Sequence, residues 1–155
     1  MKFSIFKKNT EIPKFEIDSP QLSITSSAQN LKALLKNAKV KYKVVSRGYI
    51  VFEGFAFNCD IPLMIGIHFN AVKIEFIEIF RPLAYYESEN FDINISFSEL
   101  SKVLRKRYGE PIVTTSTSIN DYPCEEWHTS DYMVNHYIMD RFGLEEHLHI
   151  KFFKR

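Results

Sequence analysis

The chain has 155 residues and a net charge of only +1, a balance that argues against a surface built throughout for binding polyanions. A chain of this length can bury roughly 70% of its unfolded surface, so it needs no disulfide or metal to hold it together. Fourteen Phe and eight Tyr are typical of a β-rich core. We therefore expect one domain over residues 1–155.

The N-terminal segment Met1–Lys8 lacks the apolar run of about 7–15 residues that a signal peptide requires. No stretch approaches the roughly 20 apolar residues of a membrane span. We expect a cytoplasmic protein that makes no membrane contact. Cys59 and Cys124 are expected to be free thiols in a reducing compartment, and the sequence leaves a disulfide between them open.

Four β-rich runs predict four consecutive antiparallel strands, at residues 40–45, 49–57, 63–69 and 72–80. Gly48 tolerates the positive φ of the first turn. Within the third run, one face carries Ile65, Ile67 and Phe69 and the other carries Met64, Gly66 and His68. The fourth run changes sides near Phe76 and Ile77, which a β-bulge or cover on both faces would explain.

Two amphipathic helices are predicted, each beginning at a Ser-x-x-Gln/Glu capping box. The first spans residues 27–38 with Ser26 as its cap. The second begins after Ser96 and stops at Gly109. Between the sheet and this second helix, residues 83–95 are expected to form a mostly irregular connection.

Four more strands are expected after the second helix, at residues 112–117, 125–129, 132–141 and 145–153. The last two are expected to pair as a hairpin around Phe142-Gly143-Leu144. The order of one helix and four strands then occurs twice, over half-repeats 26–80 and 96–154. This order predicts an α+β fold with two main helices packed on one antiparallel sheet or two related sheets.

Motifs for catalysis or cofactor binding are absent: the sequence has no phosphate-binding glycine loop, paired Cys-x-x-Cys or nucleophile elbow. We therefore predict no catalytic residue and no cofactor. If the hairpin register allows, three imidazoles of His136, His147 and His149 share one face and could hold Zn²⁺. We prefer to interpret these histidines as the polar face of a hairpin, so no metal is assigned.

A small metal-dependent or hydrolytic enzyme built on these late residues is the alternative function. A hydrolase would need a nucleophile beside a base, and Cys124 with His128 or His136 is one such pair. Glu125 or Glu126 is the candidate general acid or base. The spacing does not enforce contact between any of them. Trp127 is interpreted as a packing anchor.

Charge is distributed unevenly along the chain. Residues 32–47 hold six basic side chains, and no acidic residue occurs between Ser19 and Phe52. A nucleic-acid binder that uses this stretch is a second alternative, which the near-neutral total disfavours. Residues 75–99 are acidic and lie beside aromatic residues. We predict a partner-binding strip there, made of Tyr85, Tyr86, Glu87, Glu89, Phe91 and Asp92.

Two resemblances to known proteins add to these expectations. The helix-to-strand corner Tyr108-Gly109-Glu110-Pro111 resembles that of small bacterial α+β modules, including the fold of β-lactamase inhibitor proteins. As a small, aromatic-rich chain without catalytic motifs, the protein is also similar to immunity proteins of bacterial toxin systems, such as contact-dependent inhibition. That resemblance implies a non-enzymatic protein that neutralises a cognate toxin domain by direct binding. It implies nothing about oligomeric state.

Overall fold

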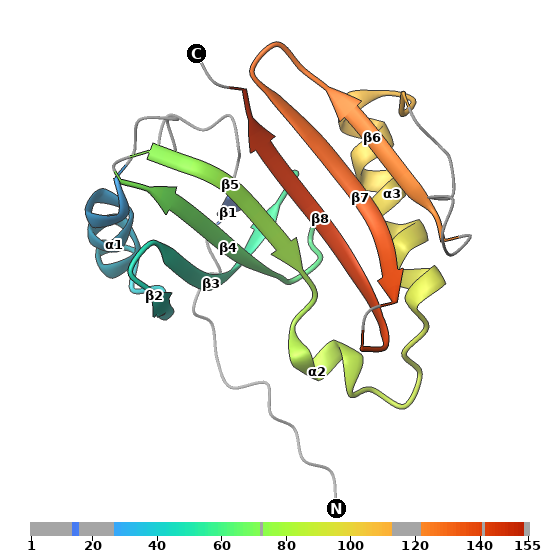
Figure 1. Cartoon of the computed structure of the whole chain (residues 1–155). Helices are drawn as coiled ribbons and strands as arrows, with labels where there is room; N and C mark the ends of the chain where they lie inside the picture. Colours follow the sequence, from blue (N-terminus) through green and yellow to red (C-terminus); the bar gives the residue numbers. More distant parts are fainter. Residues whose placement is uncertain (1–13, 16–26, 72, 113–121, 141, 154–155) are drawn as a thin grey trace, which may run out of the picture.

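The structure, a computed structural model, describes residues 14–15, 27–71, 73–112, 122–140 and 142–153. It confirms the α+β class with an antiparallel sheet and two main helices (Figure 1). Within these residues, one sheet holds strands β1 (Lys14–Phe15), β2 (Tyr42–Ser46), β3 (Tyr49–Ala56), β4 (Leu63–Asn70), β5 (Lys73–Phe80), β6 (Cys124–His128), β7 (Tyr132–Asp140) and β8 (Leu144–Phe152). The helices are α1 (Ala28–Asn37), α2 (Leu83–Tyr86) and α3 (Ile93–Tyr108).

Strands β2 to β5 form the predicted antiparallel meander. Across the sheet the order is β1-β3-β4-β5-β8-β7-β6, and β2 also pairs with β3. The two halves of the chain meet where β5 pairs antiparallel with β8, so they build one continuous sheet. The strand predicted at 112–117 lies outside the described residues, except for Ile112, which is not in a strand.

Helix α1 begins one residue later than the sequence predicted. Ser27, not Ser26, is its N-cap, and the Ser27 hydroxyl accepts a hydrogen bond from the backbone N–H of Asn30 at 3.1 Å. This bond satisfies one of the N–H groups that a helix start leaves without a partner. The helix buries Leu31 and Leu35 against the sheet.

Helix α3 begins four residues earlier than predicted, because Asp92 rather than Ser96 is its N-cap. The Asp92 carboxylate accepts hydrogen bonds from the backbone N–H groups of Asn94 and Ile95. Residues 83–95 are therefore not mostly irregular, since they contain α2 and the first turn of α3. The helix ends as predicted at Gly109, which has a φ of +81°.

A β-bulge explains why β5 changes sides. Phe69 pairs with Ile74 and His68 pairs with Phe76, so Glu75 is an extra residue without an opposite partner. The bulge lies just before the position where the sequence pattern changed. As a result Ile74, Ile77 and Ile79 all point into the core.

Both main helices pack on the same face of the sheet. Side chains from α1 and α3 join one apolar cluster with the inward residues of β3, β4, β5, β7 and β8, and α3 lies behind β6 and β7 in Figure 1. Trp127 is the packing anchor that the sequence predicted: it is 2% exposed, and its indole N–H donates to the carbonyl of Gly109.

A polar network is buried between α3 and the sheet. His136 is fully buried, and its Nε2 lies 2.8 Å from Oε1 of Glu146. Ser96 of α3 donates its hydroxyl to the same Glu146 carboxylate and accepts a hydrogen bond from Nε of Arg81. On the other side of His136, Ser101 donates to Glu125. The Ser96 hydroxyl thus bonds to residues distant in the sequence, which explains why it does not cap the helix.

Candidate functional site

The sheet face opposite α1 and α3 carries a row of aromatic rings. Neighbouring strands place Tyr49, His68 and Phe76 side by side. The ring of His68 stacks between the other two, with centroid distances of 3.8 Å to Tyr49 and 3.9 Å to Phe76. These side chains are only partly buried, so the row forms an outer surface of the protein.

Glu78 is the charged centre of this open face. Its Oε2 accepts a hydrogen bond from the hydroxyl of Tyr49 at 2.9 Å and lies 3.4 Å from Nε2 of His68. Its Oε1 lies 3.7 Å from Nε2 of His149 on β8. Contacts with His149, and also with Tyr49 and His68, stabilise the charged carboxylate and lower the pKa of Glu78 to about 2, although burial opposes the shift. Burial and the Glu78 carboxylate raise the pKa of Tyr49 above its usual range.

Gly66 makes the contact between Tyr49 and Glu78 sterically possible. A Cβ atom at Gly66 would lie 2.7 Å from Cε2 of Tyr49 and 2.8 Å from its hydroxyl oxygen. The tyrosine ring therefore lies directly over the glycine and extends across β4 to reach β5. Any larger residue at position 66 would displace the ring.

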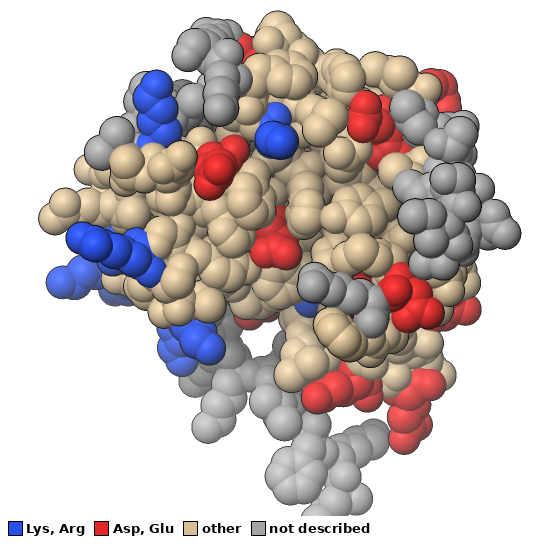
Figure 2. All heavy atoms as spheres, viewed as in Figure 1, with Lys and Arg blue, Asp and Glu red and all other residues tan. Residues whose placement is uncertain are grey.

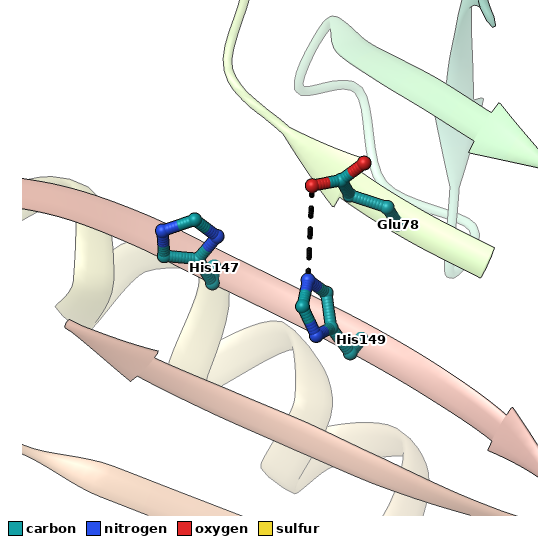
Figure 3. Close-up of side chains that lie close together, drawn as sticks. All are labelled: Glu78, His147 and His149. Carbon is teal, nitrogen blue, oxygen red and sulfur yellow. Dashed lines mark ion pairs between the residues drawn. The ribbon is translucent and has the colours of Figure 1, made fainter. Parts of the chain in front are cut away.

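Two histidines of β8 complete the cluster, as Figure 3 shows. His147 and His149 are two residues apart on one strand and point to the same side as Glu78 of the adjacent β5. Donor atoms of these three side chains all lie within 4.8 Å of one another. Burial, together with the nearby His149, lowers the pKa of His147 and favours its neutral form.

A pocket of about 450 Å³ opens at the end of this face, between β5, α2 and the turn from β7 to β8. Its lining residues are Tyr49, Glu78, Phe80, Leu83, Tyr86, Phe142, Gly143, Leu144, Glu145, Glu146 and His147. Three apolar members of this lining are exposed to solvent: Leu83 at 70%, Phe142 at 90% and Leu144 at 42%. The pocket thus combines an apolar edge with carboxylates.

The predicted partner-binding strip divides into two parts. Tyr85, Tyr86 and Phe91 pack against one another with edge-on ring contacts, so they are half-buried. Tyr86 also lines the pocket, and burial raises its pKa to about 12. Glu87 and Glu89 are exposed, as the prediction requires. Asp92 is exposed too, but its carboxylate caps α3.

The three histidines that the sequence offered as metal ligands do not come together. His136 pairs with Leu148 in the β7–β8 register and points into the core, whereas His147 and His149 occupy the opposite face. The ring of His136 stacks on Phe97 of α3 at 3.9 Å. Sequence reasoning did not name Glu78 as a site residue. The available signal was a carboxylate placed between the apolar residues Ile77 and Ile79 of β5.

The groups named for hydrolysis are also divided between faces. Cys124 is on the open face, while His136 and Glu125 are buried beneath α3. His128 lies 2.6 Å from a carboxylate oxygen of Glu126. Burial, with the two neighbouring glutamates, raises the pKa of Cys124, which disfavours a reactive thiolate. Both cysteines are free thiols.

Charges of opposite sign gather at different ends of the open face (Figure 2). Lys and Arg side chains collect mainly at the left, over α1 and β2, and most Asp and Glu side chains lie at the right, near α2 and the β7–β8 turn and again near β6. The broad area between them carries few charged side chains, one of which is an acidic group near its centre. The blocks seen in the sequence therefore form separate surfaces in space.

No family model, curated protein or solved structure is similar enough to this chain to place it in a family. Among the described helices, none combines the length and apolar character needed to cross a membrane.

Proposed function

We propose that this chain is a non-enzymatic protein-binding module, and that its pocket receives an apolar side chain flanked by basic residues of a partner protein. The observation that carries the proposal is the exposure of Leu83 and Phe142 beside a pocket that also contains Glu78 and Glu145. Exposed apolar side chains grouped around a concave site are typical of interaction surfaces.

The charges near the pocket favour a basic partner. Glu78 is ionised at neutral pH because its pKa is about 2. Glu145 is half exposed at the pocket, and Glu87 and Glu89 are exposed on the segment that follows α2. A Lys or Arg of the partner would lie near several carboxylates, and such complementarity speeds association and fixes its orientation.

The resemblance to immunity proteins supports a toxin domain as that partner. In this form of the proposal, the protein occupies a basic surface of the toxin and blocks it. It predicts that a toxin domain is encoded beside the gene for this chain. Co-expression of this chain should then restore growth of cells that produce the toxin domain. Failure to restore growth would refute the toxin domain as the partner, although another protein partner would still be compatible with the proposal.

The test is affinity capture from the source cells, followed by mass spectrometry. The variant Leu83→Ser/Phe142→Ser removes the apolar edge of the pocket. The matched control Val45→Ser/Ile112→Ser removes two side chains that are also exposed, at 51% and 64%, but lie on β2 and after α3. The proposal expects a protein retained by the wild type and the control and lost by the pocket variant. Equal retention by all three would refute it.

Charge reversal tests the acidic part of the site separately. Glu87→Lys/Glu89→Lys should weaken binding of the captured partner and leave the melting temperature unchanged, since both side chains are exposed. Asp92 is left intact because its loss would disturb the start of α3. Unchanged affinity of this variant would show that the strip does not contact the partner.

A further inference from the structure

We propose that Glu78, His147 and His149 form a binding site for a divalent transition-metal ion of the Zn²⁺ class on the open face of the sheet. This inference concerns a site rather than a partner, and it does not depend on the proposed protein-binding function. It rests on three features: the convergence of the donor atoms, the buried Nε2 of His149 that makes no hydrogen bond, and the contacts that orient the ligands.

The donor atoms already lie nearly close enough to share an ion. They are within 4.8 Å of one another, and Nε2 of His149 is 3.7 Å from Oε1 of Glu78. Zn²⁺ binds nitrogen and oxygen at about 2.0–2.2 Å in tetrahedral geometry, which separates its ligand atoms by about 3.3–3.6 Å. Small side-chain rotations would therefore close the site, because the adjacent strands β5 and β8 already fix the backbone.

One donor of the site, Nε2 of His149, lacks a hydrogen-bond partner, and Nε2 of the neighbouring His147 lacks one too. Nε2 of His147 and Nε2 of His149 are both shielded from solvent, and neither makes a hydrogen bond. The nearest carboxylate oxygen to Nε2 of His147 is Oε2 of Glu145 at 3.3 Å, without hydrogen-bond geometry. Buried polar atoms without partners are costly and uncommon. A metal ion between Glu78 and Nε2 of His149 would give this buried nitrogen a partner.

Neighbouring side chains orient the ligands as outer partners do in metal sites. The hydroxyl of Tyr49 engages Oε2 of Glu78 and leaves Oε1 facing His149. On the other side, the Tyr137 hydroxyl lies 3.4 Å from Nδ1 of His149, which leaves Nε2 for an ion. A ligating imidazole usually has its second nitrogen engaged in this way.

Two imidazoles and one carboxylate suit Zn²⁺, and also Ni²⁺ or Cu²⁺, better than Mg²⁺ or Ca²⁺. Because Glu78 and His147 also line the pocket, an ion bound here would lie beside it. The site would thus bind its ion with three protein ligands and retain one position for water or for a group from a partner.

The experiment titrates the full chain, treated with a chelator and then freed of it, with ZnCl₂ in competition with a chromophoric chelator at neutral pH. Wild type should bind one ion per chain. Glu78→Gln and His149→Asn should each weaken Zn²⁺ binding at least about tenfold. Loss of a residue that only supports a metal ligand already costs about that much, and these variants remove a ligand itself. The matched control is His128→Asn, which alters an imidazole–carboxylate pair elsewhere on the same face and should leave affinity unchanged.

Circular dichroism of each variant shows whether it is folded. If His149→Asn is unstable, Glu78→Gln still tests the site, because glutamine has nearly the same shape as glutamate. Co²⁺ provides a second readout, because tetrahedral Co²⁺ with nitrogen ligands absorbs strongly in the visible range and the wild type should show this band. Absence of stoichiometric Zn²⁺ binding by folded wild type would overturn the proposal. Binding that both ligand variants leave unchanged would also overturn it.

Discussion

Replacing His136 with alanine should lower the free energy of unfolding by about 4–6 kcal/mol. The imidazole is fully buried, and its Nε2 contacts the buried carboxylate of Glu146 at 2.8 Å. Truncating a large buried side chain to alanine costs about 3–5 kcal/mol, and loss of the contact with Glu146 and of the stack on Phe97 adds about 1 kcal/mol. Part of the cost arises because the buried Glu146 carboxyl group loses the contact with His136.

Urea unfolding, followed by the fluorescence of the buried Trp127, measures this loss. His128→Ala is the matched control: that histidine side chain is 45% exposed, and its removal should change stability by no more than about 0.5 kcal/mol. The double variant His136→Ala/Glu146→Gln should be more stable than His136→Ala alone, since a neutral amide costs less to leave buried without this partner than an ionisable carboxyl group. A cost for His136→Ala below about 1 kcal/mol would refute this account of the network.

Two further predictions concern Glu125 and Gly66. Burial favours a higher pKa for Glu125, but His136, Ser101 and Arg105 outweigh it and lower the pKa to about 2. Since an unfolded Glu titrates at about pH 4.3, this carboxylate stabilises the fold above that pH, and the contribution is lost as pH falls toward 2. Glu125→Gln should therefore flatten the decline of the urea midpoint between about pH 5 and 2, and parallel declines would contradict this. Gly66→Ala should cost about 1–3 kcal/mol in urea unfolding because its Cβ would lie 2.7 Å from the Tyr49 ring. In a Tyr49→Ala background the same change should cost far less, and an equal cost would place the strain elsewhere.

Much of the fold could be predicted from local patterns, because strands and helix ends depend on nearby residues. Alternation located the strands β2–β5, and the glycine after Tyr108 correctly marked the end of α3. The start of α3 was wrong for a physical reason. Ser96 has the sequence of a cap, but its hydroxyl is engaged by Arg81 and Glu146, 15 and 50 residues away. No local pattern encodes those contacts.

The candidate site was less accessible to sequence reasoning. That His147 and His149 share a strand face followed from their spacing, and the structure agrees. Glu78 could not be added to them without knowing that β5 lies beside β8. The bulge at Glu75 also decides which side Glu78 faces, and the local pattern indicated the change of side but did not distinguish a bulge from cover on both faces. The site therefore depends on register as much as on residue type.

The pairing of β5 with β8 has a consequence for how the protein is made. During synthesis the meander emerges first, and one edge of β5 has no neighbour until β8, some 70 residues later, leaves the ribosome. Closing so long a loop is slow, and an open strand edge invites other chains to pair with it. Charged side chains on an open strand discourage such pairing, and β5 carries Lys73, Glu75 and Glu78. The nascent chain thus carries its own protection against aggregation until its sheet is complete.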